Sequence, residues 1–280
     1  MADPLLSIKG LVIEATSYPP GEPPKNVTLV HGVDLTLQRG KVLGLIGESG
    51  AGKSTIGLSA MSYGRGGVRL TGGTIQLNGR EIRLASPREL RALRGREVTY
   101  VSQSAAASFN PAKQIMEQVI EASLSHGLMS KQEAEARARG LFRKLGLPNP
   151  DTIGNRYPHQ VSGGQLQRCM TAMALCPKPD LVIFDEPTTA LDVTTQIDVL
   201  AAIKEAIRDT QVAALYITHD LAVVAQVADE IMVLRHGRMV ELGETGQVIR
   251  EPDGERRGLV RFSKPLLGSD EWSFICDEPV

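Results

Sequence analysis

The stretch Gly47-Glu48-Ser49-Gly50-Ala51-Gly52-Lys53-Ser54 decides the fold of this chain, because it matches the pattern G-x-x-x-x-G-K-[ST] of a phosphate-binding loop. Residues 41–46 before it are mostly apolar and predict a short strand, and residues 55–61 after it carry apolar side chains at helical spacing. A strand, a glycine-rich turn and a helix form the setting that such a loop requires. The alternative, a glycine-rich turn that carries lysine and serine by chance, is disfavoured by both flanks.

Each part of this loop has a chemical reason to be there. Glycines let backbone N–H groups close around phosphate oxygens, which a Cβ atom would obstruct. The helix expected to begin near Lys53 directs the positive end of its dipole at the same anion. The Lys53 side chain can reach β- and γ-phosphates, and the Ser54 hydroxyl can ligate Mg²⁺. The predicted nucleotide-binding residues of this segment are Gly47, Glu48, Ser49, Gly50, Ala51, Gly52, Lys53, Ser54 and Thr55.

The composition excludes several classes of protein. The chain has 280 residues, enough for one large domain or two modest ones, and its formal net charge of -1 argues against a nucleic-acid-binding surface. Without a run of eighteen apolar residues or a basic start followed by an apolar core, we expect neither a membrane span nor a secretory signal. Cys169, Cys176 and Cys276 lack metal-ligand spacing. The first two are expected to be small buried residues of one helix in a reducing cytoplasm.

Apolar patterning predicts alternating strands and helices. Strands are expected at residues 5–15, 33–37, 41–46, 74–77, 97–101, 181–186, 212–217 and 230–235, and helices at 55–61, 86–94, 112–125, 130–145, 166–176, 195–208 and 245–250. Asn78-Gly79 predicts a hairpin turn, and the serines Ser86 and Ser130, each followed three residues later by glutamate, predict capped helix starts. Residues 104–177 offer no strand pattern and indicate a helical insert. The proline-rich stretch 17–25 is expected to be a surface loop, and the polar stretch after residue 251 a poorly structured tail.

A second group of polar residues follows two apolar strands. Asp185 and Glu186 end an entirely apolar run, which predicts a strand buried on both faces, as in a parallel sheet. Ligands bind at the carboxyl ends of such strands, so Asp185 is predicted to hold Mg²⁺ and Glu186 to face the water that attacks a γ-phosphate. His219 follows the next apolar strand at the same kind of position. The alternatives are solvated carboxylates at a capped strand end and a structural histidine.

Two further features carry weaker signals on their own. Ser162, Gly163, Gly164 and Gln165 open an apolar helix, and serine with two glycines at a helix start can form a second anion-binding element. Tyr18 lies in the proline-rich loop before the phosphate-binding segment. It could stack on an adenine ring, or it could be a partly buried loop tyrosine, and the sequence does not decide between the two.

Taken together, these motifs resemble those of the ATP-binding subunit of an ABC transporter. In family order they are the phosphate-binding loop, Gln103 as the Q-loop glutamine, 161–165 as the signature, 181–186 as Walker B, 190–192 as the D-loop and His219 as the switch histidine. The signature differs from the usual Leu-Ser-Gly-Gly-Gln only by a valine at its first position. Finer features, including Tyr157-Pro158-His159-Gln160 and Ser108-Phe109-Asn110-Pro111, resemble the dipeptide, oligopeptide and nickel importer branch.

The resemblance implies an α/β fold: a P-loop NTPase (RecA-like) core with an antiparallel β subdomain and an inserted α-helical subdomain at about 104–177. The ATPase domain would cover residues 1–250 and the tail 251–280; with Cys276 alone beyond the core, we expect no iron–sulfur cluster. The implied ligands are ATP and Mg²⁺, with Glu186, His219 and Gln103 catalytic, Ser54, Gln103 and Asp185 at the metal, and Asp192 beside the nucleotide. Tyr18 is only a candidate for the adenine-stacking aromatic, since the family position falls near Ala15.

The same resemblance implies partners and location. In the family two such subunits face each other and enclose ATP, as a homodimer or a heterodimer, and dock onto ABC permease subunits at the cytoplasmic face of the inner (plasma) membrane. An external substrate-binding protein would act indirectly, and no nucleic acid is implied. A soluble ABC-type ATPase acting on DNA or ribosomes is the main alternative, disfavoured because no heptad run, cysteine cluster or internal repeat is present. A regulatory module without activity is disfavoured by the intact Lys53, Asp185, Glu186 and His219.

Overall fold

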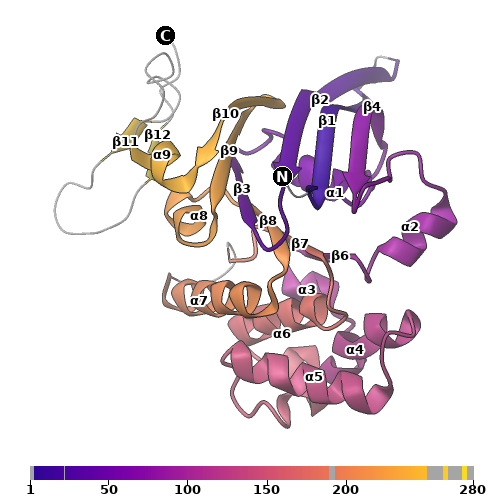
Figure 1. The fold of residues 1–280 in the computed structure, drawn as a ribbon, viewed down its shortest axis with the longest axis vertical. Helices are drawn as coiled ribbons and strands as arrows, with labels where there is room; N and C mark the ends of the chain where they lie inside the picture. The colour runs from indigo at the N-terminus through magenta and orange to yellow at the C-terminus, as the bar shows by residue number, and fades with distance from the viewer. Residues whose placement is uncertain (1–2, 22, 189–192, 251–260, 264–272, 276–280) are drawn as a thin grey trace.

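The computed structural model of the protein describes residues 3–21, 23–188, 193–250, 261–263 and 273–275. A six-stranded sheet runs through the middle of the molecule, with an antiparallel sheet on one side of it and a layer of helices on the other (Figure 1). This arrangement confirms the expected α/β fold with an antiparallel β portion and a helical portion. No helix among the described residues is both long and apolar enough to cross a membrane.

The six-stranded sheet has the order β10-β9-β3-β8-β7-β6, in which the five strands from β9 to β6 run parallel. Every residue of β7 and β8 is buried, because helices or strands cover both faces of the sheet. The strands are β3 (Val42–Gly47), β6 (Val98–Val101), β7 (Leu181–Asp185), β8 (Ala213–Ile217), β9 (Glu230–Arg235) and β10 (Arg238–Glu244). Their parallel direction brings the carboxyl ends of β3, β6, β7 and β8 to one edge.

The antiparallel sheet has the order β2-β1-β4-β5, with β1 (Leu6–Ser17), β2 (Lys25–Leu37), β4 (Val68–Leu77) and β5 (Arg80–Glu81). The pairing of β1 with both neighbours has a register irregularity near Gly10, which has a positive φ of 58°. The inner faces of this sheet share one apolar core with helix α1 (Lys53–Ser59) and the near face of the large sheet. The phosphate-binding segment is thereby held between the two sheets.

The helical layer follows β6 and returns to the sheet at β7. It contains α3 (Ala105–Ser108), α4 (Ile115–Ser125), α5 (Lys131–Lys144), the short 3-10 helices Ile153–Asn155 and Pro158–Gln160, and α6 (Gly163–Leu175), and α7 (Val193–Thr210) packs on it. These helices bury a second core against the other face of the large sheet. Cys169 and Cys176 are buried there, as predicted, and burial raises the pKa of the Cys169 thiol to about 12. Cys276 lies outside the described residues.

The helix starts predicted from serine caps are confirmed. Helix α2 (Pro87–Leu93) begins after Ser86 and α5 after Ser130, and in both the serine side chain accepts from the backbone N–H three residues on while that glutamate bonds back. The Asn78-Gly79 turn joins β4 to β5, as predicted, with positive φ at both residues. These sequence patterns predict the local structure correctly because the residues that interact lie within four positions of each other.

Five elements were not predicted from the sequence. Helix α8 (Leu221–Val227) was missed because its seven residues are apolar on nearly every side, and α3 because it is a single turn. Strand β10 was missed because its residues alternate weakly at the sheet edge. In the tail, expected to be poorly structured, β11 (Arg261–Ser263) pairs antiparallel with β12 (Ser273–Ile275). The final helix α9 (Thr245–Arg250) is present, as predicted.

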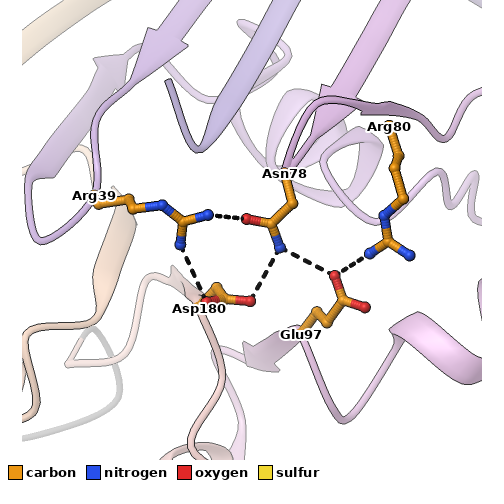
Figure 2. Close-up of polar contacts among 5 residues, drawn as sticks. All are labelled: Arg39, Asn78, Arg80, Glu97 and Asp180. Carbon is orange, nitrogen blue, oxygen red and sulfur yellow. Dashed lines mark hydrogen bonds and ion pairs between the residues drawn. The ribbon is translucent and has the colours of Figure 1, made fainter. Parts of the chain in front are cut away.

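A polar cluster joins the two sheets on the side where β6 and β7 begin (Figure 2). The Asn78 amide donates to Glu97 and Asp180, at 3.1 and 3.0 Å, and its carbonyl oxygen accepts from Arg39. Arg80 forms an ion pair with Glu97. The hairpin turn of the antiparallel sheet is therefore bonded to the starts of two strands of the large sheet.

Candidate nucleotide-binding site

The phosphate-binding segment forms the turn between β3 and α1, as the sequence predicted. Gly47, Gly50 and Gly52 have φ angles of 151°, 82° and 94°, in the region where residues with a Cβ are strained. A Cβ at Gly47 would also lie 2.1 Å from the carbonyl oxygen of Leu234 on β9. Glycine at these positions is therefore required by the path of the backbone, and a turn of this kind can direct its N–H groups at an anion.

Lys53 lies inside this turn. Its side chain is buried at 5% exposure, and Nζ donates to the carbonyl oxygens of Gly47 at 2.7 Å and Glu48 at 2.9 Å. Burial lowers the pKa of Lys53, while the negative charges of Glu186 and Asp185 act in the opposite direction. The ammonium group is thus held against the backbone of the loop, where the charges of Asp185 and Glu186 act on it.

Asp185 forms the wall of the site opposite the turn. It is 7% exposed, and its Oδ1 atom accepts a hydrogen bond of 2.8 Å from the Ser54 hydroxyl. The phenol of Tyr100, on the neighbouring strand β6, donates to Oδ2 at 2.6 Å. Burial and then this carboxylate raise the pKa of Tyr100, so the phenol remains the donor. Sequence reasoning missed Tyr100, because its meeting with Asp185 depends on strand order and register.

Glu186, His219 and Gln103 meet beside this wall. His219 Nδ1 lies 3.3 Å from Glu186 Oε1, and Gln103 Nε2 donates to Glu186 Oε2 at 3.3 Å. The three side chains come from the ends of β7, β8 and β6. Glu186 has a positive φ of 47°, and its N–H donates to the Ile217 carbonyl at 2.9 Å, so the chain turns sharply there. A carboxylate oriented by two polar neighbours can hold a water molecule in a fixed position.

The residues present fit a magnesium ion. Mg²⁺ in phosphate-handling sites is usually held by one or two protein oxygens, by substrate phosphates and by water, rather than by a complete protein cage. Ser54 and Asp185 offer such oxygens in direct contact with each other. Among the described residues no group of three acidic, histidine or cysteine side chains could hold a metal alone, so a bound ion would also need phosphate or water ligands. The Gln103 amide contacts Glu186 rather than Asp185.

The signature residues lie in a different layer. Ser162 caps helix α6: its hydroxyl accepts from the Gln165 N–H at 3.3 Å, and the Gln165 side chain accepts from the Ser162 N–H at 3.1 Å. Ser162 and Gly163 are exposed, whereas Gly164 is buried against Thr195 of α7. In Figure 1, α6 belongs to the helical layer and α1 lies beside the antiparallel sheet. The phosphate-binding turn and the predicted second anion-binding element of one chain therefore lie in different layers.

The remaining predicted site residues are Tyr18, Asp192 and Thr55. Tyr18 is 75% exposed on the loop between β1 and β2, and its contact with an adenine ring stays a prediction. Asp192, predicted to lie beside the nucleotide, and the rest of the expected D-loop fall outside the described residues. Thr55 continues α1 directly after Ser54, at the end of the phosphate-binding turn.

The sequence is similar to one protein family model and to transport ATP-binding proteins. The sequence model of the ABC transporter family matches residues 30–189, more than half of the chain. The dipeptide transport ATP-binding protein DppD of Bacillus subtilis is 37% identical over 95% of this chain and 76% of its own length. The oligopeptide transport ATP-binding protein OppD of Escherichia coli is 38% identical over 90% of this chain and 73% of its own.

Solved structures show the same architecture. The dimeric structure of MJ0796, a bacterial ABC transporter cassette, superposes with a TM-score of 0.72 over 86% of this chain and 98% of that one, at 25% identity. Its dimeric post-hydrolysis state bound to ADP and Pi superposes with a TM-score of 0.73 over the same shares of both chains, at 24% identity. With a phosphate-binding turn, a paired Ser54 and Asp185, and a family match over most of its length, the chain belongs to the ABC transporter family and has the fold of an ATP-binding cassette.

Proposed function

We propose that this chain hydrolyses ATP and thereby powers the import of peptides or similar small solutes through a separate ABC permease. The observation that carries the proposal is the meeting of Glu186, His219 and Gln103 beside Asp185, at the edge of the sheet where the phosphate-binding turn opens. Relatives named as dipeptide and oligopeptide transport ATP-binding proteins support the peptide class of solute.

Each residue has a role in the proposed reaction. The turn amides and Lys53 bind the β- and γ-phosphates, and they offset the charge that spreads over the phosphoryl oxygens in the transition state. Ser54 and Asp185 would hold Mg²⁺, which when bound supplies positive charge to the phosphate oxygens. Glu186 orients and polarises the attacking water. His219 fixes the position of Glu186 and contacts the γ-phosphate, and Gln103 donates a hydrogen bond to Glu186.

A second ATPase subunit completes the proposed site. Because the exposed Ser162 and Gly163 lie in the helical layer, they cannot close over the turn of their own chain without a rearrangement of the fold. Two subunits facing head to tail would bring the signature of one to the γ-phosphate held by the other. Loss of the γ-phosphate then removes what holds the two together. Both a homodimer and a pair with a sibling ATPase satisfy this geometry.

The permease would dock in an apolar groove between the large sheet and the helical layer. The groove has a volume of about 420 Å³, and its lining includes Leu58, Tyr63, Arg94, Tyr100, Ala122 and Met173. A short apolar helix of a membrane partner has the size and chemistry to fill it. This would place the chain peripherally at the cytoplasmic face of the inner membrane, and an external substrate-binding protein would act on it only through the permease.

The proposal is tested by ATP hydrolysis and by ATP-dependent dimer formation. We expect Glu186→Gln to lower turnover at least a hundredfold, the usual scale for removal of a catalytic base, while ATP binding is kept. In size-exclusion chromatography this variant should form dimers with ATP and remain monomeric without it. Glu205→Gln, the same change at an exposed glutamate of α7, is the matched control and should behave as the wild-type chain.

Three results would contradict parts of the proposal. Turnover of Glu186→Gln near that of the wild-type chain would remove Glu186 from its role. A wild-type chain that neither binds nor hydrolyses ATP, alone or with its co-purified partners, would refute the ATPase activity itself. Membrane vesicles containing the co-purified subunits should accumulate labelled peptide with ATP, and the failure of all short peptides would refute the proposed class of solute.

A further inference from the structure

Tyr100 reaches from β6 to the carboxylate that ends β7. Strands β6 and β7 run parallel with Tyr100 opposite Ile183, so the backbone of Tyr100 lies two residues before the level of Asp185, and its side chain reaches along the strand to that carboxylate. The 2.6 Å bond from its hydroxyl to Oδ2 is the shortest that Asp185 makes in the described structure. The hydrogen bond between the phenol and the carboxylate thus joins two adjacent strands, whose relative positions are fixed by their pairing in the sheet.

The two oxygens of Asp185 have separate partners. Oδ1 accepts from Ser54, at the start of α1, and Oδ2 accepts from Tyr100. A carboxylate held at one oxygen can still rotate about its last bond, whereas a carboxylate held at both has a fixed plane. Outer partners that orient a metal-binding carboxylate commonly change metal affinity by about 10–100-fold when they are removed.

The aromatic ring of Tyr100 has different neighbours from its hydroxyl group. It lies in the wall of the groove described above and packs against the core shared by the two sheets. Removing the hydroxyl alone leaves this wall and this packing in place. Tyr63, which lines the same groove and stacks under the guanidinium of Arg94, makes no bond to Asp185 in the described structure. The two tyrosines therefore form a matched pair for experiment.

We propose that Tyr100 is a positioning residue: its hydroxyl fixes the plane of the Asp185 carboxylate so that Oδ1 faces the metal-binding position beside Ser54. The inference rests on the proposed function, since it assigns Tyr100 to the magnesium site of the same nucleotide pocket. Tyr100 itself touches neither nucleotide nor metal. It acts through Asp185, from the strand that leads to Gln103.

The test measures binding, separately from turnover. The dissociation constant of a fluorescent N-methylanthraniloyl ATP is measured for the full chain in EDTA and again with excess Mg²⁺. For Tyr100→Phe we expect the affinity in EDTA to stay within about twofold of wild type and the tightening by Mg²⁺ to shrink about tenfold. Tyr63→Phe should leave both values unchanged. Thermal unfolding of each variant without ligand checks that the fold is kept.

The outcomes separate this inference from the proposed function. A Tyr100→Phe chain with the full magnesium effect of the wild type would overturn the positioning role. Equal weakening with and without Mg²⁺ would also overturn it, since that is the result of a general structural role. Tyr100→Met, which fills similar space without a hydroxyl, must reproduce the loss seen in Tyr100→Phe. If the wild-type chain binds no nucleotide at all, the proposed function fails, and this inference fails with it.

Discussion

Replacement of Asn78 by alanine tests how the two sheets are joined. Asn78 is the centre of the polar cluster in Figure 2, where its side chain makes two hydrogen bonds to carboxylates and accepts one from a guanidinium. Its φ of 52° lies in the left-handed region, which asparagine tolerates better than alanine. The substitution therefore removes three polar contacts and also strains the backbone of the turn.

The expected loss follows from these two contributions. The partner carboxylates Asp180 and Glu97 are 38% and 20% exposed, so solvent screens the bonds, and each bond contributes about 0.5–1 kcal/mol. Three bonds then contribute about 2 kcal/mol, and alanine in the left-handed region costs about 1 kcal/mol more. A total of about 3 kcal/mol corresponds to a fall of about 6–12 °C in the midpoint of thermal unfolding for a domain of this size.

Asn149→Ala is the matched control for this experiment. Asn149 has a φ of 50°, is exposed, and makes no side-chain hydrogen bond to any residue in the described part of the chain. Its replacement strains the backbone alone and should lower the midpoint by about 2–4 °C. Both variants are compared by calorimetry and by urea unfolding. Equal losses in the two variants would refute the view that the polar cluster stabilises the junction of the sheets.

Two further predictions concern the signature and the acid stability of the same cluster. A Cβ at Gly164 would lie 2.3 Å from the Cγ2 atom of Thr195, so Gly164→Ala should lower the free energy of unfolding by about 1–3 kcal/mol. Adding Thr195→Ser removes that Cγ2 atom and should recover most of the loss. Urea unfolding that shows no recovery would contradict the steric explanation. Burial alone would raise the pKa of Glu97, but its bonds to Arg80 and Asn78 outweigh burial and hold the pKa below its usual 4.5. A carboxylate with a lowered pKa stabilises the fold fully above 4.5 and loses that contribution as pH falls through the lower, folded-state pKa, so the unfolding free energy should decline below pH 4.5 and decline less steeply in Glu97→Gln. Identical acid profiles for the two chains would exclude this role of Glu97.

Most of the local structure could be predicted from the sequence. The phosphate-binding turn, the capped helix starts at Ser86 and Ser130 and the hairpin at Asn78 depend on residues within about four positions of one another, so a short stretch carries the whole signal. The family motifs also indicate that Gln103, Asp185, Glu186 and His219 belong to one site, although these residues are far apart along the chain.

The contacts between residues distant in sequence depend on the tertiary structure. Gln103 and Glu186 are 83 positions apart, and Tyr100 and Asp185 are 85 apart. They meet only because β6 lies beside β7 in parallel register, and the order of strands in a sheet is set by the packing of whole faces rather than by any local pattern. The sequence by itself therefore predicted which residues bind phosphate and metal, whereas only the fold placed the Tyr100 hydroxyl on the carboxylate of one of them, Asp185.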